Sequence, residues 1–355
     1  MDKYRLDSHK LIYHVPRVNR WLSGETIYPI YMELSPSGMC NHRCSFCALD
    51  FMGYQKRFLK TEIFKERLAE MGRLGVKSIM FGGEGEPFLH KDMVDLAVHT
   101  KESGIDVAFT TNGVFLRPEV NKEILRCTSW IKVSINAGTP ATYAKVHNTK
   151  AADFEKVIDN MAKAAEVRRA ENLGCTLGMQ ILLLPENQHE IVGLAKTAKE
   201  IGMDYLVVKP YSQHPSSHTQ EYGDLHYEGL GEIQEAVDRL NTPDFKVILR
   251  LNAIRKWNEK ERGYDRCLAL PFWSYIDSGG NVWGCSIYLG DERFRYGNIY
   301  EENFQEIWSG ERRRESLRWV ENEFDAQKCR VNCRMDEINR YLWELKNPSS
   351  HVNFI

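Results

Sequence analysis

The sequence predicts an α/β protein in which helices cover a parallel sheet and a small C-terminal domain follows. Strand-like runs alternate with segments of helical periodicity through most of the chain, as in successive βαβ units. The chain has 355 residues. Because domains usually hold about 100–200 residues, either one barrel-sized domain or a large and a small domain are expected. Seven of the nine cysteines fall into two groups, which indicates metal sites.

Six βα-type units can be followed along the chain. The predicted strands are short apolar runs at residues 30–34, 78–81, 105–110, 130–134, 176–184 and 205–208. The predicted helices, in which apolar residues recur at helical spacing, cover residues 61–74, 92–103, 119–126, 153–172 and 188–201. Because a helix separates each strand from the next, a parallel sheet is expected.

Composition and charge exclude several classes of protein. The 47 Lys and Arg residues nearly balance the 49 Asp and Glu residues, so the net charge is −2 and no nucleic-acid partner is expected. No stretch approaches the roughly 18 apolar residues of a membrane helix, and the N-terminus is charged. We therefore expect a cytoplasmic protein without a membrane partner. In that reducing compartment, cysteines are expected to bind metals or take part in catalysis.

Three cysteines, Cys40, Cys44 and Cys47, lie together in the segment CNHRCSFC. The segment follows the first predicted strand, where barrel enzymes build their chemistry. Thiolates at this spacing can converge on one iron–sulfur cluster, and three ligands leave one iron open for a substrate or cofactor. A zinc site completed by His42, or three incidental cysteines, is the alternative that spacing alone leaves open.

The spacing C-x3-C-x2-C, with Phe46 before the last cysteine, resembles the radical SAM superfamily. The resemblance implies a partial (β/α)6 TIM-like barrel at residues 29–250, after an N-terminal extension at 1–28. It also implies a [4Fe–4S] cluster on the three cysteines, with S-adenosylmethionine (SAM) at its open iron and Phe46 among the cofactor-binding residues. In such enzymes one electron cleaves SAM to a 5′-deoxyadenosyl radical, which abstracts hydrogen from a substrate.

The segment FGGEGEP follows the second predicted strand. Gly82 and Gly83 let the backbone approach a ligand closely, and Glu84 offers a carboxylate. The segment resembles the part of the family that binds the amino group of SAM. Taken alone, it also fits a glycine-rich turn with solvated acids.

Polar residues end the next three predicted strands. Asn112, then Ser134 with Asn136, resemble positions at which the family bonds the carboxylate and ribose of SAM. Many relatives carry Asp where this chain has Asn136, and an Arg near the position of His147. His147 could take over that contact or be an ordinary surface histidine. Gln180 is a further candidate SAM contact, with plain barrel packing as its alternative.

The segment KPYSQHPSSH, residues 209–218, follows the sixth predicted strand. Its polar density at a barrel mouth suggests substrate contact. Lys209, Tyr211 and His214 are the candidate catalytic residues of this segment. A solvated loop, or barrel packing for Lys209, is the alternative.

Four cysteines lie near the C-terminus, at Cys267, Cys285, Cys329 and Cys333. The segment IDSGGNVWGC predicts a hairpin with its turn at 278–280, and the later pair could complete a four-thiolate site of zinc or of an iron–sulfur cluster. The stretch YGNIYEENFQEIW resembles radical SAM enzymes with a SPASM or twitch domain. With only four cysteines, residues 251–355 look like the shorter twitch-like form, which holds one auxiliary [4Fe–4S] cluster.

The resemblance implies an enzyme that acts on a small polar substrate. Our leading hypothesis is oxidation of a sugar, aminocyclitol or nucleotide sugar, with the auxiliary cluster as electron acceptor and flavodoxin or ferredoxin as a one-electron reductant. A radical epimerase is an alternative and needs a hydrogen-donating thiol, for which Cys175 and Cys127 are the spare cysteines. A peptide- or protein-modifying maturase is another, although the 39 residues before Cys40 are too few for a peptide-recognition domain. A non-catalytic iron–sulfur protein is the remaining alternative.

Overall fold

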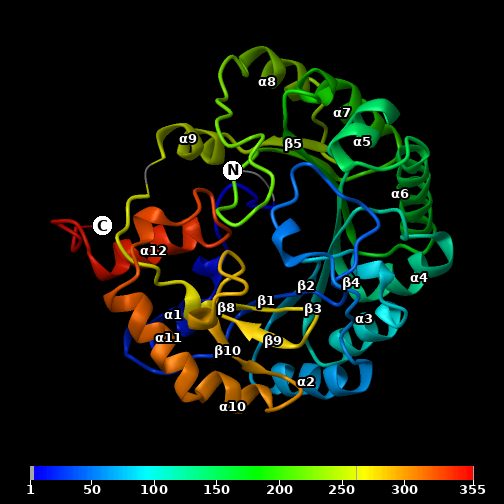
Figure 1. The fold of residues 1–355 in the computed structure, drawn as a ribbon. Helices are drawn as coiled ribbons and strands as arrows, with labels where there is room; N and C mark the ends of the chain where they lie inside the picture. Colours follow the sequence, from blue (N-terminus) through cyan, green and yellow to red (C-terminus); the bar gives the residue numbers. More distant parts are fainter. Residues whose placement is uncertain (1–3, 261, 355) are drawn as a thin grey trace.

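A computed structural model describes residues 4–260 and 262–354 and contains one ten-stranded sheet (Figure 1). The strand order is β10-β9-β8-β1-β2-β3-β4-β5-β6-β7. Neighbours are parallel from β8 to β7, and β9 and β10 add antiparallel strands at one edge. The strands are β1 (Tyr31–Leu34), β2 (Ser78–Phe81), β3 (Asp106–Thr111), β4 (Thr128–Ser134), β5 (Thr176–Leu183), β6 (Tyr205–Pro210), β7 (Lys246–Leu249), β8 (Trp273–Ile276), β9 (Asn281–Trp283) and β10 (Arg295–Asn298).

Helices surround the curved sheet on its outer side (Figure 1). They are α1 (Val15–Leu22), α2 (Thr61–Arg73), α3 (Met93–Glu102), α4 (Pro118–Cys127), α5 (Pro140–His147), α6 (Ala152–Ala170), α7 (Ile191–Glu200), α8 (Gly231–Asp238), α9 (Leu251–Glu259), α10 (Phe304–Ser309), α11 (Glu311–Asn322) and α12 (Asp336–Lys346). Within the described ranges, none of these helices has the length and apolar character needed to cross a membrane.

Strand β4 shows how the sheet separates its two faces. Ile131 and Val133 are fully buried in the main hydrophobic core, beneath the helices. Because side chains alternate along a strand, Lys132 and Ser134 lie on the opposite face, where both are half-buried. We call this opposite, concave face of the sheet the inner face.

The predicted fold class is confirmed. All six predicted strands and the five predicted helices are present, and their ends lie within three residues of the predicted ones. The sequence reading missed several elements, among them α5 and β7. Helix α5 carries an ordinary start signal, because the Thr139 hydroxyl accepts a hydrogen bond from Thr142 N at 3.3 Å and Pro140 is the first helical residue.

The C-terminal segment continues the barrel sheet. Strand β8 pairs in parallel with β1, with Tyr31 opposite Trp273, and the hairpin from β8 to β9 turns where the sequence predicts. The Asp277 carbonyl accepts a hydrogen bond from Gly280 N at 3.0 Å within this turn. Because the sheet runs across both segments, the domain boundary placed at residue 250 stays a prediction from sequence.

Candidate metal and cofactor sites

The cysteine triplet occupies the loop between β1 and the 3-10 helix η2 (Asp50–Met52), and its three thiols are half-buried. Backbone hydrogen bonds fasten this loop to the end of α5. Arg43 N donates to the His147 carbonyl at 3.1 Å, and Ser45 N donates to the Val146 carbonyl at 3.0 Å. Helix α5, which the sequence reading missed, therefore positions the cysteine loop.

The environment of the triplet suits a metal-bound thiolate. Burial, followed by the charge of Glu86, raises the pKa of Cys40 to about 12, and burial also holds the pKa of Cys44 well above its usual value. A coordinated metal removes the thiol proton outright, so burial does not prevent ligation. Three thiols on one loop fit a cluster with one open iron.

His147 lies against the cysteine loop rather than toward an open position. Its Nδ1 is 3.1 Å from Cys44 Sγ, and its Nε2 is 2.9 Å from the Ile135 carbonyl oxygen. Burial, together with the charge of nearby His42, lowers the pKa of His147 to about 3, so the ring is neutral. Both ring nitrogens are engaged, which argues against the predicted contact with SAM. Potential ligand atoms of His42, Cys44 and His147 lie within 4.8 Å of one another, but this set holds one cysteine of the triplet and differs from the zinc alternative, in which His42 completes all three cysteines.

The FGGEGEP segment meets two different parts of the molecule. Gly83 has φ of +99°, and a Cβ there would lie 2.3 Å from Tyr275 Oη, so only glycine fits. Glu84 accepts hydrogen bonds from Ser278 N at 3.0 Å and from Ser278 Oγ at 3.1 Å. It therefore ties the barrel to the C-terminal hairpin, and Gly82 precedes this contact at the end of β2.

Glu86 is the carboxylate of the same segment that lies against the cysteine loop, and the sequence reading did not single it out. Glu86 N donates to the Met39 carbonyl at 2.8 Å, and its carboxylate accepts from Thr111 Oγ1 at 2.6 Å and from Asn112 N at 2.8 Å. Burial raises the pKa of Glu86 to about 7. The signal was a second acid, followed by Pro87, in the same short segment.

Asn112 and Asn136 have different surroundings. The Asn112 amide donates to Asn41 Oδ1 at 2.7 Å and lies 4.0 Å from Cys40 Sγ, so it is part of the triplet site. Asn136 has a left-handed φ of 49°, and its Oδ1 accepts from Leu182 N at 2.9 Å. That contact joins the ends of β4 and β5, which gives Asn136 a structural task.

Ser134 and Gln180 lie side by side on the inner face, because they are direct partners in the register between β4 and β5. Ser134 is half-buried and Gln180 is buried. Both lie toward the carboxyl ends of the parallel strands, where the triplet loop leaves β1. They therefore stay candidate contacts for a bound cofactor.

The segment after β6 packs onto the triplet loop. Asp50 accepts hydrogen bonds from His218 N at 3.0 Å and from Thr219 N at 3.1 Å, while Ser217 Oγ donates to the Cys47 carbonyl at 3.2 Å. Tyr211 is buried in the apolar cluster against which Phe46 packs. The segment that the sequence offered as a substrate loop therefore also holds the cysteine loop in place.

The same segment reaches the second cysteine group. Ser212 Oγ donates to the Val331 carbonyl at 2.5 Å, and Arg330 donates to the Ser212 carbonyl at 2.5 Å. His214 is buried, stacks on Phe51 with ring centroids 5.0 Å apart, and has its pKa lowered to about 4 by burial and by the charge of Arg330. We call residues 211–219 the bridging loop, since it contacts both cysteine groups.

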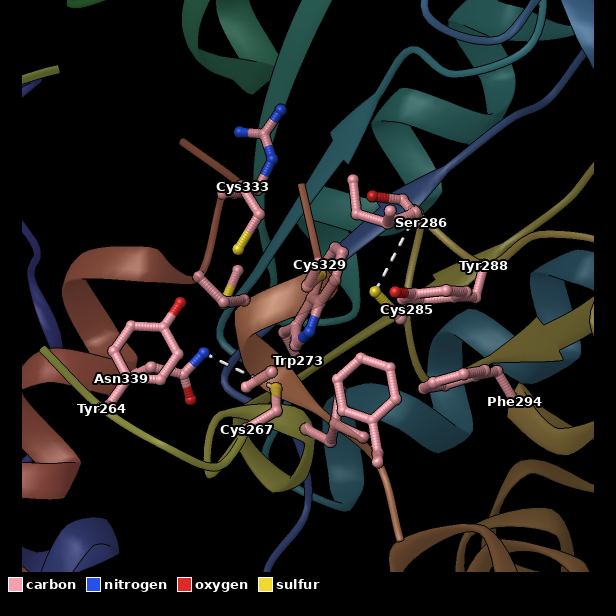
Figure 2. Close-up of a pocket in the computed structure, with 16 residues that line it drawn as sticks. Tyr264, Cys267, Trp273, Cys285, Ser286, Tyr288, Phe294, Cys329, Cys333 and Asn339 are labelled. Carbon is pink, nitrogen blue, oxygen red and sulfur yellow. Dashed lines mark hydrogen bonds between the residues drawn. The ribbon is translucent and has the colours of Figure 1, made fainter. Parts of the chain in front are cut away.

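The C-terminal quartet lines a single pocket, into which the sulfur atoms of Cys267, Cys285, Cys329 and Cys333 point (Figure 2). Ile287 N lies 3.4 Å from Cys285 Sγ, and the Asn339 amide lies 3.5 Å from Cys267 Sγ. Aromatic side chains complete much of the wall, namely Tyr264, Trp273, Tyr288, Phe294 and Phe324.

The four thiols of the quartet are half-buried, and burial raises the pKa of each of them. Arg262 is 3% exposed and donates hydrogen bonds to the Cys329 carbonyl and, at 3.1 Å, to the Arg330 carbonyl. Four thiols, amide donors and aromatic walls fit a fully ligated cluster with no position for substrate.

The two spare cysteines lie at the end of the barrel strands opposite to the triplet loop. Cys175 immediately precedes β5 and Cys127 immediately precedes β4, so both lie at the amino ends of parallel strands, and the triplet loop leaves a carboxyl end. Both sulfurs belong to the buried hydrophobic core. This placement argues against Cys175 as a catalytic hydrogen donor.

Comparisons with known proteins agree with this arrangement. The model of the radical SAM superfamily matches residues 34–198, and that of the SPASM iron–sulfur cluster-binding domain matches residues 267–334. The chain is 22% identical to a tungsten-containing aldehyde ferredoxin oxidoreductase cofactor-modifying protein of Pyrococcus furiosus, over 79% of this chain and 81% of that protein. It is 28% identical to the GTP 3',8-cyclase of Aquifex aeolicus, over 48% of this chain and 53% of the cyclase.

Solved structures show the same fold. SuiB of Streptococcus suis bound to S-adenosylmethionine superposes with a TM-score of 0.62 at 18% identity, over 84% of this chain and 70% of SuiB. The protein anSMEcpe with bound AdoMet gives a TM-score of 0.60 at 17% identity, over 88% of each chain. Residues 34–198 therefore form a radical SAM domain and residues 267–334 a SPASM-type iron–sulfur cluster-binding domain, and these two domains imply two iron–sulfur clusters and SAM as cofactors.

Proposed function

We propose that this enzyme oxidises a small polar substrate and that its two cysteine groups divide the electron chemistry between them. The observation that carries the proposal is the contrast between three thiols on one loop of the barrel and four thiols around one pocket, with one bridging loop in contact with both groups. The triplet would hold the SAM-binding cluster. The quartet would hold an auxiliary cluster that accepts the second electron.

When bound, the SAM-binding cluster supplies the electron that cleaves SAM to a 5′-deoxyadenosyl radical. The chain's own residues would bind SAM and shield the site from water. Glu86, Asn112, Ser134 and Gln180 lie where β2 to β5 approach the triplet, and they are our candidates for contacts with the amino, carboxylate and ribose groups of SAM. The cluster formed by Phe46, Tyr211 and its apolar neighbours excludes water beside Cys47.

The proposed oxidation converts an alcohol carbon of a sugar, aminocyclitol or nucleotide sugar to a ketone. One hydrogen atom leaves the carbon and ends in 5′-deoxyadenosine, one electron leaves to the acceptor, and the hydroxyl proton leaves to a base. That base is solvent rather than His214, because His214 Nδ1 already accepts a hydrogen bond from Ser216 N at 3.1 Å and burial, followed by the charge of Arg330, lowers the pKa of the ring to about 4. A one-electron reductant such as flavodoxin or ferredoxin would start each turnover.

The test is anaerobic turnover of the reconstituted enzyme with dithionite, SAM and a panel of sugars. We expect one oxidised product for each 5′-deoxyadenosine formed in the presence of the true substrate. Product that keeps its oxidation state and gains solvent deuterium would instead show epimerisation. Absence of 5′-deoxyadenosine from a preparation with both clusters intact would overturn the proposal.

Modification of a peptide or protein is the second candidate. The observation that favours it is fold similarity to SuiB and anSMEcpe, each of which has also been solved with a bound peptide. The same turnover assay, run with a library of short peptides in place of sugars, separates the two proposals. A mass change in a peptide would support this second function.

A further inference from the structure

Two lysines on the inner face form no ion pair with any residue that the structure describes. Lys132 lies on β4 and Lys209 on β6, and both are half-buried. Their strand neighbours Val133 and Val208 are buried in the core beneath the helices. Because side chains alternate along a strand, both lysine side chains therefore lie on the inner face of the sheet, and the triplet loop lies at the carboxyl ends of its strands.

The other charged groups around these lysines are already paired or engaged. Arg334 forms an ion pair with Glu33 of β1, and Arg250 lies 3.3 Å from Asp7. Arg330 is turned to the bridging loop through Ser212. In the described ranges, no carboxylate lies within 4.0 Å of the Lys132 or Lys209 ammonium group. The inner face therefore carries an excess of positive charge.

Burial and the neighbouring cations make this arrangement unfavourable without a counter-charge. Burial, and then the charges of Arg334 and Arg250, lower the pKa of Lys132 to about 7, with Glu33 acting in the opposite direction. Burial and the charge of Lys132 hold the pKa of Lys209 well below its usual value. A bound anion would stabilise the charged form of both lysines.

We propose that the substrate carries an anionic group, a phosphate or a carboxylate, and that Lys132 and Lys209 bind this group on the inner face. The inference rests on the proposed function, because it narrows the substrate of that same site. It favours a sugar phosphate, nucleotide sugar or sugar acid, and it disfavours an aminocyclitol, whose ammonium groups would meet like charge.

The test is anaerobic calorimetric titration of the holoenzyme, with SAM present, against four matched sugars. Glucose 1-phosphate carries a phosphate, glucuronate a carboxylate, glucose no charge, and glucosamine a positive charge. We expect at least one of the two anions to bind about tenfold or more tightly than glucose, as two charge-assisted contacts require. The anion that binds tighter distinguishes a phosphate from a carboxylate substrate. Equal affinity for the anions and glucose overturns the inference.

The double variant Lys132→Met/Lys209→Met should bind the preferred anion no more tightly than glucose. The control Lys77→Met/Lys196→Met removes two exposed lysines and should keep the preference. A preference that survives in Lys132→Met/Lys209→Met overturns the inference. If that variant fails to load both clusters, the two single variants and the wild-type series still decide.

The same samples separate this inference from the proposed function. Formation of 5′-deoxyadenosine with dithionite, in the absence of any sugar, reports only on SAM cleavage. We expect wild type and the control variant Lys77→Met/Lys196→Met to form it equally. Normal SAM cleavage without anion preference overturns the inference alone, whereas no SAM cleavage by wild type overturns the proposed function, whatever the titration shows.

Discussion

The two cysteine sites use the same thiol chemistry but are assembled differently. The triplet comes from one loop, which α5 and the bridging loop hold in place. The quartet gathers Cys267 after α9, Cys285 after the hairpin, and two cysteines before α12. A site built from one loop can stay open on one side, because nothing else has to close around it. A site built from distant segments is also a crosslink, so its loss is expected to affect the fold as well as the chemistry.

Removal of the triplet should have the largest effect on activity. We expect Cys40→Ala/Cys44→Ala/Cys47→Ala to abolish 5′-deoxyadenosine formation and to lower bound iron from about eight to about four atoms per chain, as for two four-iron clusters. Anaerobic iron and sulfide analysis with Mössbauer spectra checks this. Iron that falls to zero would show that the quartet does not hold a cluster by itself.

Removal of two quartet cysteines should have the opposite pattern of effects, with a smaller loss of SAM cleavage and a larger loss of stability than removal of the triplet. We expect Cys329→Ala/Cys333→Ala to lose the second cluster and substrate oxidation, but to keep SAM cleavage within about tenfold, since the triplet lies on a separate loop. The melting temperature should fall further than in the triplet variant. Calorimetry and the 5′-deoxyadenosine assay measure both effects. Equal melting temperatures would contradict the crosslink argument.

Asn339 tests the quartet separately from the triplet, because its hydrogen bonds hold the segment that contains Cys267. Its Oδ1 accepts from Leu268 N at 2.7 Å and from Ala269 N at 2.9 Å, and its amide lies near Cys267 Sγ. Asn339→Leu leaves these buried groups unpaired, so we expect a loss of about 2–4 kcal/mol in the free energy of unfolding. Urea unfolding of the holoenzyme measures it. The spectrum of the triplet cluster should stay unchanged.

The sequence predicted what local patterns encode. Alternating periodicity determined the strands and helices of the barrel, and thiol spacing marked both cysteine groups. Contacts between distant segments were not predictable in this way. Glu84 contacts Ser278 and Glu86 contacts Met39 of the triplet loop, because the loop after β2 packs against two different segments of the chain. In the sequence, Cys175 was a candidate hydrogen donor, but it lies at the start of β5, at the strand end opposite to the triplet loop.

His147 shows a second limit. A histidine near a SAM site suggests a ligand contact, yet helix α5 directs both ring nitrogens to protein atoms. The helix is short and begins with Pro140, and its role depends on backbone contacts with a loop a hundred residues earlier in the chain. Pairings of this kind depend on tertiary structure, which residue patterns in one sequence do not reveal.

The smallest predicted effect concerns the link between the two sites. Asp50 accepts hydrogen bonds from Ser217, His218 and Thr219 of the bridging loop, and Asp50→Asn weakens these charge-assisted contacts by about 1–2 kcal/mol in total. We expect the KM for SAM to rise a few-fold and more 5′-deoxyadenosine to form per oxidised product. The exposed Asp224→Asn is the matched control.

The ratio of 5′-deoxyadenosine to product separates two roles for this loop. If it only covers the triplet, Asp50→Asn should alter the KM for SAM and leave the ratio unchanged. If it also aligns the substrate between the two sites, the ratio should rise, and Ser212→Ala should raise it too, because Ser212 contacts Val331 on the quartet side. A change confined to Asp50→Asn would show that the two sites work independently. Agreement between the variants would make the bridging loop the element that couples SAM cleavage to oxidation.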